Sequence, residues 1–427
     1  MDKKNILHLS IVWVIYGTLI NRFIWNNQLI TLIPDILLFT LLFLDKPHKG
    51  QFNLQSYVGK TVVSIFYFIL ILGIISSFVS STPIAATLWG ARQFFRYGLM
   101  GYMIMLYFGP KDIVWGRKIL YQSILWNMIF VVIELSLGQT GDAMGGTFSG
   151  NGEFAIYLIA ITFISEIEYF QHRLSIQKFI IIFGFCFISG VLAEIKLLYI
   201  LLPFTLYSGY VLFKKFNIKQ VIVLMAAYFF LIPTVKFILS FYYDENYIES
   251  TFDSEEVNKY LENDYALQSG KTQLLSFNRN TCIERSSTIL LQDPKAFLIG
   301  NGIGSLTQSQ LFKTTLADVY HPTYYFFFTF SYVLLELGWL GFILFISFYA
   351  CMAYRFYRHY RNAKDVVIKY WSSIGLFMTC VSYIFMWYNA IPYSNYYFTF
   401  ILFGLCFTGI KNRKQKLFIN KYKKNDT

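Results

Sequence analysis

His321 is the residue of this chain with the clearest capacity for proton transfer. It lies where a polar segment, residues 242–320, gives way to the apolar sequence PTYYFFFTFSYVLLELGWLGFILF. A neutral imidazole can take a proton from a hydroxyl group near physiological pH. Of the five histidines, His321 alone is expected to face the outside of the cell, for reasons of topology given below. A histidine at this border could also serve only as a helix cap, so the residue by itself leaves both roles open.

Five basic residues could hold a phosphate-containing group. Arg279 and Arg285 lie in the polar segment, and guanidinium is the preferred protein partner of phosphate because its fork binds two oxygens at once. Arg92 and Arg96 are four residues apart and share one helix face, where they either reach toward the membrane surface or line a cavity for an anionic head group. Lys196 lies at a tight turn between two apolar stretches, which makes it either a turn residue or a further anion contact.

The sequence carries no familiar signature of a nucleotide or metal site. It contains no GxxxxGK[ST] loop, no HExxH motif and no cluster of cysteine and histidine. We therefore expect no metal and no other cofactor, and a substrate that brings its own leaving group. The net charge of +12 resides in short loops between apolar stretches, which indicates membrane orientation and excludes nucleic acid as the expected partner.

Composition predicts the element type that must position these residues. Hydrophobic residues make up 56% of the chain and charged residues 14%, compared with about 25% charged in soluble domains. This predicts an all-α, polytopic integral membrane protein with about 12 transmembrane helices in a single domain, 1–427. The predicted spans are 6–24, 28–44, 57–79, 95–109, 119–137, 153–169, 178–194, 197–213, 220–241, 338–354, 370–388 and 393–410.

Charge distribution orients the predicted spans. With the N-terminus inside, 25 of the 36 lysines and arginines fall on the cytoplasmic side, including a basic tail at 411–427. The stretch 322–354 is long enough for a hairpin of two crossings, but that would put the basic run at 355–364 outside. We therefore expect 322–337 to be a short or re-entrant helix at the outer face. Both termini are then cytoplasmic, and 242–320 is a large external loop.

The order of several short motifs resembles the O-antigen polymerase and O-antigen ligase superfamily of bacterial envelope enzymes. The resemblance spans roughly residues 90–355, and each motif is weak alone, but their order around one large external loop is more specific. Lys196 stands where many relatives carry arginine, and either Arg279 or Arg285 could fill the position of the loop arginine. The motifs are GGTFSGNGEFAIYL, AEIKLLYILLP, ERSSTILLQDPKAFLIGNGIGS and HPTYYFFFTFSYVLLELGWLGFILF.

The resemblance implies an architecture like that of GT-C glycosyltransferases and a reaction at the outer face of the bacterial cytoplasmic membrane. The donor would be an oligosaccharide on undecaprenyl diphosphate, embedded among membrane lipids. Arg279 or Arg285, with Arg92, Arg96 and Lys196, would bind the diphosphate, and His321 would orient or deprotonate the acceptor hydroxyl.

The resemblance favours a polymerase of O-antigen or capsular repeat units, with a chain-length regulator as a further partner that it allows. Two alternatives stay open. A ligase would transfer finished glycan to lipid A core. A flippase of lipid-linked oligosaccharide would show repeated halves, which this sequence lacks.

Overall fold

The computed structural model describes residues 2–25, 27–44, 54–148, 150–213, 218–253, 276–309 and 313–425. These residues form helices and contain no β-strand, only one isolated antiparallel bridge between Gln308 and Lys313. The prediction of an all-α fold is confirmed. Two parts of the predicted external loop, 254–275 and 310–312, lie outside the described residues, as do the last two residues of the basic tail.

The helices follow one another through connections that are mostly short. The first half contains α1 (Lys3–Leu19) with a π-helical turn (Ile20–Ile24), a 3-10 turn (Gln28–Leu32), α2 (Ile33–Leu44), α3 (Leu54–Tyr57), α4 (Lys60–Val79), α5 (Ile84–Tyr107), α6 (Pro110–Ser136), a 3-10 turn (Gly141–Ala143), α7 (Asn151–Phe170), α8 (Ile176–Leu192) and α9 (Lys196–Phe213). The second half contains α10 (Ile218–Leu239), α11 (Glu245–Phe252), α14 (Cys282–Leu290), α15 (Pro294–Ile299), α16 (Thr315–Tyr320), two 3-10 turns (His321–Thr323 and Tyr325–Phe327), α17 (Thr329–Asn362), α18 (Val366–Tyr388), α19 (Ile391–Ser394) and α20 (Tyr397–Asn425).

Each predicted span overlaps one of these helices. Among the described residues, six helices are long and apolar enough to cross a membrane, and three apolar helices are shorter. The structure therefore supports a helical membrane protein, while twelve crossings stay a prediction. The six are Lys3–Ile24, Lys60–Val79, Pro110–Ser136, Lys196–Phe213, Thr329–Asn362 and Val366–Tyr388; the three are Leu29–Leu44, Ile176–Leu192 and Tyr228–Leu239.

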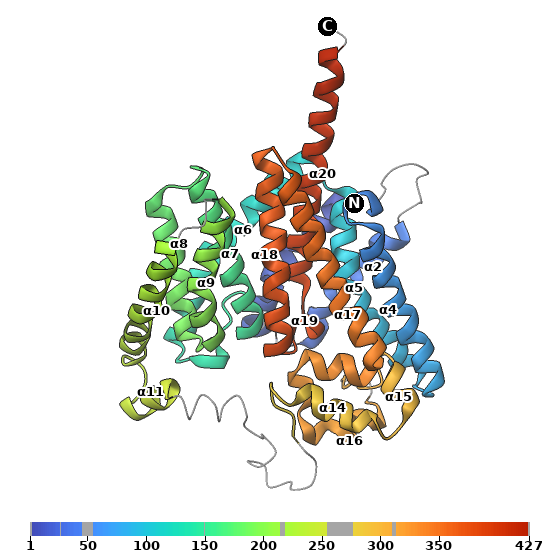
Figure 1. Ribbon diagram of the computed structural model, residues 1–427. Coiled ribbons are helices and arrows are strands. Elements are labelled where there is room, and N and C mark those ends of the chain that lie inside the picture. The colour runs from blue at the N-terminus through green and yellow to red at the C-terminus, as the bar shows by residue number, and fades with distance from the viewer. Residues whose placement is uncertain are drawn as a thin grey trace.

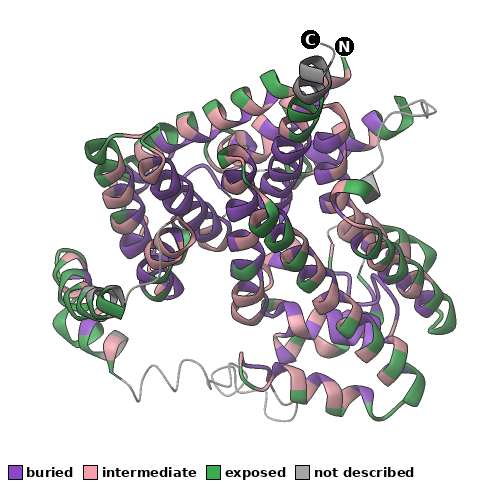
Figure 2. Ribbon diagram, turned by 45° about the horizontal axis from the view of Figure 1, so that its top comes forward, coloured by how far each residue is buried: buried purple, intermediate pink, exposed green. Residues whose placement is uncertain are grey.

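The helices pack as one bundle with small helices at one end (Figure 1). Helix α7 is buried on all sides from Glu153 to Glu168 and contacts α8, α9 and α18, while α18 also packs on α17 and α20. Buried residues accordingly concentrate along the central helices (Figure 2). Helices α14, α15 and α16 lie together below the bundle in Figure 1, and we call this end the loop end. Both termini lie at the opposite end.

Helix α17 breaks at Gly338, whose φ of 63° and ψ of −171° are not helical. The sequence predicts a helix that ends at 337 and a new one from 338, and the break agrees with this. The start of the first piece differs: regular α-helix begins at Thr329, not at 322. The preceding residues form 3-10 turns because Tyr324 adopts a left-handed conformation, φ 57°, which stops helix propagation. Tyr325 and Phe328 are thereby buried in a small core at the loop end.

The glycine turn 300–304 anchors the loop end to the bundle. Ser76 and Ser77 on α4 donate hydrogen bonds to the carbonyl oxygens of Gly300 (2.9 Å) and Ile303 (3.1 Å). A Cβ at Gly304 would lie 2.0 Å from the carbonyl oxygen of Ala86 on α5. Only glycine allows this close approach, so the turn has a structural role that explains its residue types.

We expect Gly304→Ala to destabilise the protein by about 2–4 kcal/mol, because it combines an unfavourable φ of +83° with a backbone clash. The matched control is Gly138→Ala, where φ is +72° but nothing lies within 4 Å of the new Cβ. The free energy of unfolding of the control should fall by only about 1–2 kcal/mol. Thermal unfolding of both purified variants measures the difference, and equal transition temperatures would contradict the anchoring role.

Candidate functional site

A cavity of about 230 Å³ lies at the loop end, where three segments distant in sequence meet. Its walls are residues 150–153 at the start of α7, Phe326 and Phe327 in the turn before α17, and residues 389–391 between α18 and α19. Two of these segments belong to motifs that the sequence singles out. The third, in the sequence YNAIP, was not predicted to contribute to a site.

His321 lies at the end of α16, next to this cavity. Its side chain is exposed, and its ring stacks on Phe326 with ring centroids 5.0 Å apart. Phe326 lines the cavity, so the imidazole contacts a wall residue, although His321 is not among the lining residues. Its carbonyl oxygen accepts a hydrogen bond from Tyr324 N–H (3.1 Å), which closes the turn and holds the backbone of His321 in place.

Arg279 does not line the cavity, but it contacts Tyr388, the residue that precedes the wall residue Asn389. Its Nε–H donates to the carbonyl oxygen of Tyr388 (3.1 Å), and its guanidinium lies 4.6 Å from the Tyr388 ring centroid. Tyr388 directly precedes Asn389, a wall residue. The segment that carries Arg279 is tied to the segment of His321, because Phe277 N–H donates to the carbonyl oxygen of Thr323 (2.8 Å).

Arg285 lies farther along the same segment, on α14. Its side chain is half-buried. Its backbone N–H donates a helical hydrogen bond to the carbonyl oxygen of Thr281 (2.9 Å). Like Arg279, it is not among the residues that line the cavity. The contact of Arg279 with Tyr388, next to the wall residue Asn389, is what associates Arg279 with the cavity, and sequence spacing gave no ground for this choice.

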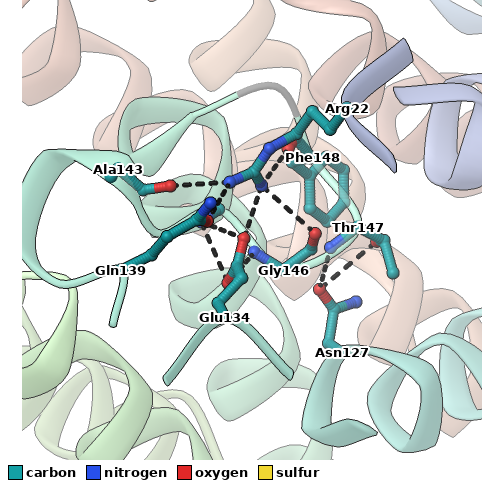
Figure 3. A network of polar contacts seen from close by, with 9 residues as sticks. Arg22, Asn127, Glu134, Gln139, Ala143, Gly146, Thr147 and Phe148 are labelled. Carbon is teal, nitrogen blue, oxygen red and sulfur yellow. Dashed lines mark hydrogen bonds and ion pairs between the residues drawn. The ribbon is translucent and has the colours of Figure 1, made fainter. Parts of the chain in front are cut away.

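A network of polar contacts holds residues 143–148 of the glycine-rich loop before α7 (Figure 3). The guanidinium of Arg22 pairs with Glu134 (2.5 Å) and donates to the carbonyl oxygen of Ala143 (2.6 Å). Glu134 also accepts from the N–H of Gly146 (3.0 Å). Glu134 thereby positions the loop.

Arg92 and Arg96 share one carboxylate partner, Asp35 of α2. Their Nη1 atoms lie 3.0 Å and 3.2 Å from Asp35 Oδ2. Arg96 is buried and also donates to the carbonyl oxygen of Ser394 (2.7 Å), while Tyr397 donates to the other oxygen of Asp35. The two predicted anion contacts therefore meet in one cluster, which has two cations for one carboxylate. Whether this excess positive charge binds a diphosphate stays a prediction.

We expect Asp35→Asn to destabilise the protein by about 3–5 kcal/mol, because it leaves two neighbouring guanidinium groups without their carboxylate. Arg92→Gln is the matched control, since it leaves one arginine for one aspartate. Thermal unfolding in detergent compares them. If Asp35→Asn is as stable as the parent protein, another anion balances the arginines, and lipid phosphate should then copurify with the variant.

Lys196 begins α9 and is half-buried, but it does not line the cavity. The turn before it contacts the glycine-rich loop, because a carboxyl oxygen of Glu194 lies 2.7 Å from where a Cβ of Gly141 would be. Tyr243 and Tyr247 donate hydrogen bonds to Glu194. The turn that carries Glu194 thus supports the glycine-rich loop. An anion-binding role for Lys196 stays a prediction.

Sequence reasoning missed three polar residues in the cavity wall, Asn151, Glu153 and Asn389. Glu153 stands within the motif GGTFSGNGEFAIYL and is the first residue of the predicted span 153–169, and this position was the available signal. Asn389 has no such signal, because its place depends on the packing of α18. In the part of the chain that the structure describes, no three metal-ligating side chains gather into a site.

Comparison with known proteins finds no family model and no curated protein that matches this chain.

Proposed function

We propose that this chain polymerises oligosaccharide repeat units carried on undecaprenyl diphosphate into O-antigen or capsular polysaccharide, at the outer face of the bacterial cytoplasmic membrane. The observation that carries the proposal is the cavity at the loop end, with His321 stacked on the wall residue Phe326 and Arg279 bonded to Tyr388, next to the wall residue Asn389. A proton acceptor and a cation near one cavity are what glycosyl transfer from a diphosphate requires.

The reaction is an inverting displacement. The oxygen of an acceptor hydroxyl bonds to the anomeric carbon of the donor, while the bond from that carbon to the diphosphate oxygen breaks. The electron pair of that bond leaves with the lipid diphosphate, and the hydroxyl proton passes to the imidazole of His321. Arg279 stabilises the negative charge that develops on the leaving diphosphate, with the excess charge of Arg92 and Arg96 as a second source.

A large apolar cavity supports a lipid-linked substrate. It has about 320 Å³ and lies between α4, α5, α17 and α20, with Phe66, Gly98 and Phe403 among its lining residues. Helix α5 contributes residues 95–105 to this cavity directly after the turn that carries Arg92. One helix thus carries a cation pair and an apolar wall in succession, a combination suited to a lipid with an anionic head group.

Incubation of the purified protein with a lipid-linked repeat unit tests the proposal. A ladder of glycan products on a gel is the expected result. Transfer only to lipid A core would show a ligase in place of a polymerase. Absence of any glycosyl transfer, with intact lipid-linked substrate recovered, would contradict both activities.

A further inference from the structure

We infer that the cavity at the loop end binds a single neutral sugar ring, with Glu153 and Asn389 as the residues that select it. The identity of the saccharide rests on the proposed function, whereas the capacity to bind a sugar ring does not. Sugar hydroxyls both donate and accept hydrogen bonds, and the ring presents an apolar C–H face. A site for one sugar ring therefore needs an acceptor, a donor and an apolar or aromatic surface.

Asn389 supplies the donor. Its Oδ1 accepts from the backbone N–H of Ile391 (3.0 Å), so its orientation is fixed by the start of α19. Its backbone carbonyl oxygen accepts from both the N–H (3.2 Å) and the hydroxyl (2.7 Å) of Thr329. A Cβ at Gly152 would lie 2.7 Å from Ile391 Cγ1 and 3.2 Å from Asn389 Nδ2. Glycine at 152 therefore allows the start of α7 to approach the segment that carries the amide of Asn389.

Glu153 supplies the acceptor. It lies in the first turn of α7, where the helix dipole favours a carboxylate, and only 8% of its surface is exposed. It lines the cavity at the loop end and also a smaller cavity of about 60 Å³, which Tyr397 lines as well. Glu153 thus lines both cavities, and the smaller one shares Tyr397 with the cluster of Asp35, Arg92 and Arg96.

Phe326 and Phe327 supply the aromatic surface, and Phe327 is about half exposed. The volume of about 230 Å³ is below the roughly 300–1,000 Å³ of pockets that hold drug-sized ligands, which suits one ring and not an oligosaccharide. None of the described residues that line the cavity is lysine or arginine. A ring with its own carboxylate would meet Glu153 without a lining cation to balance it, so a neutral ring is favoured.

Sugar binding is measured without any lipid-linked substrate. Saturation-transfer difference NMR compares methyl glycosides of neutral hexoses and N-acetylhexosamines with those of hexuronic acids, on the purified full chain. We expect signals from at least one neutral sugar and weaker ones from the uronic acids. Glu153→Gln should weaken binding about tenfold or more, because a hydrogen bond to a charged acceptor contributes about 1.5–3 kcal/mol.

A second variant keeps the test independent of folding. Asn389→Asp retains the oxygen that accepts from Ile391 N–H but removes the Nδ2 donor, and it should also weaken binding about tenfold. Glu245→Gln, at an exposed carboxylate on α11, is the matched control and should bind as the parent does. Circular dichroism melting verifies the fold of each variant.

The outcomes separate this inference from the proposed function. Glycan ladders without measurable sugar binding, or binding that survives both Glu153→Gln and Asn389→Asp, overturn the inference and leave the polymerase proposal intact. Sugar binding that is lost in both variants, without any glycosyl transfer by the parent, supports the inference and contradicts the polymerase.

Discussion

Replacement of His321 by alanine is expected to lower glycosyl transfer by about 10²–10⁴-fold, which would remove the product ladder. This range is typical of the loss of a general acid or base. The ring is exposed and its stacking on Phe326 is a surface contact, so the variant should insert and fold as the parent does. Initial rates of transfer from a lipid-linked repeat unit, together with thermal unfolding, measure the two effects separately.

Two further substitutions sharpen the role of His321. His321→Gln keeps a side chain that can donate and accept hydrogen bonds but cannot take a proton at neutral pH, so retained activity would indicate orientation of the acceptor and not proton transfer. The matched control is His172→Asn, at an exposed histidine with φ +56°, a conformation that asparagine tolerates. Full activity of His321→Ala would show that the assignment of His321 is wrong.

For Arg279→Gln we expect a loss of about 10²–10³-fold in transfer rate, the magnitude found when one stabilising donor to a developing negative charge is removed. Arg279→Lys should recover only part of the lost transfer rate, because an ammonium group keeps the charge but not the fork that binds two oxygens. The substitution also removes the contact with Tyr388, so thermal unfolding must accompany the rate measurement.

Arg285→Gln is the matched control, because it changes the same residue type in the same segment, away from the cavity wall. We expect it to lower the rate less than tenfold. A larger loss for Arg285→Gln than for Arg279→Gln would identify Arg285 as the diphosphate contact. Equal, small losses for both would remove this segment from the reaction and leave Arg92 and Arg96 as the candidates.

Local sequence signals were sufficient to predict where the long helices lie, but not how the helices pack against one another. The basic run at 355–364 argued against a hairpin, and the resulting division of the apolar stretch 322–354 after residue 337 agrees with the break in α17 at Gly338. The turn at Tyr324 was missed, because seven residues from 322 to 328 are mostly aromatic and as apolar as a helix. Their burial in a small core, and not their hydropathy, decides their conformation.

The candidate site shows a similar division. The sequence identified His321 and the two loop arginines by residue type, and it placed them at one face through charge distribution. It could not choose Arg279 over Arg285, since both have the same chemistry and lie six residues apart. The choice follows from the contact of Arg279 with Tyr388, a residue 109 positions away.

By itself, the sequence determined an all-α chain with the composition of a membrane protein and the approximate positions of its long apolar helices. Hydropathy and charge depend only on residues that are close in sequence, so they can be predicted without knowledge of the tertiary structure. Only the tertiary structure decided that Asp35 lies between Arg92 and Arg96, that glycines 300–304 anchor the loop end, and that three distant segments enclose one cavity. These depend on which helix faces meet, and that is set by side-chain packing across the whole bundle.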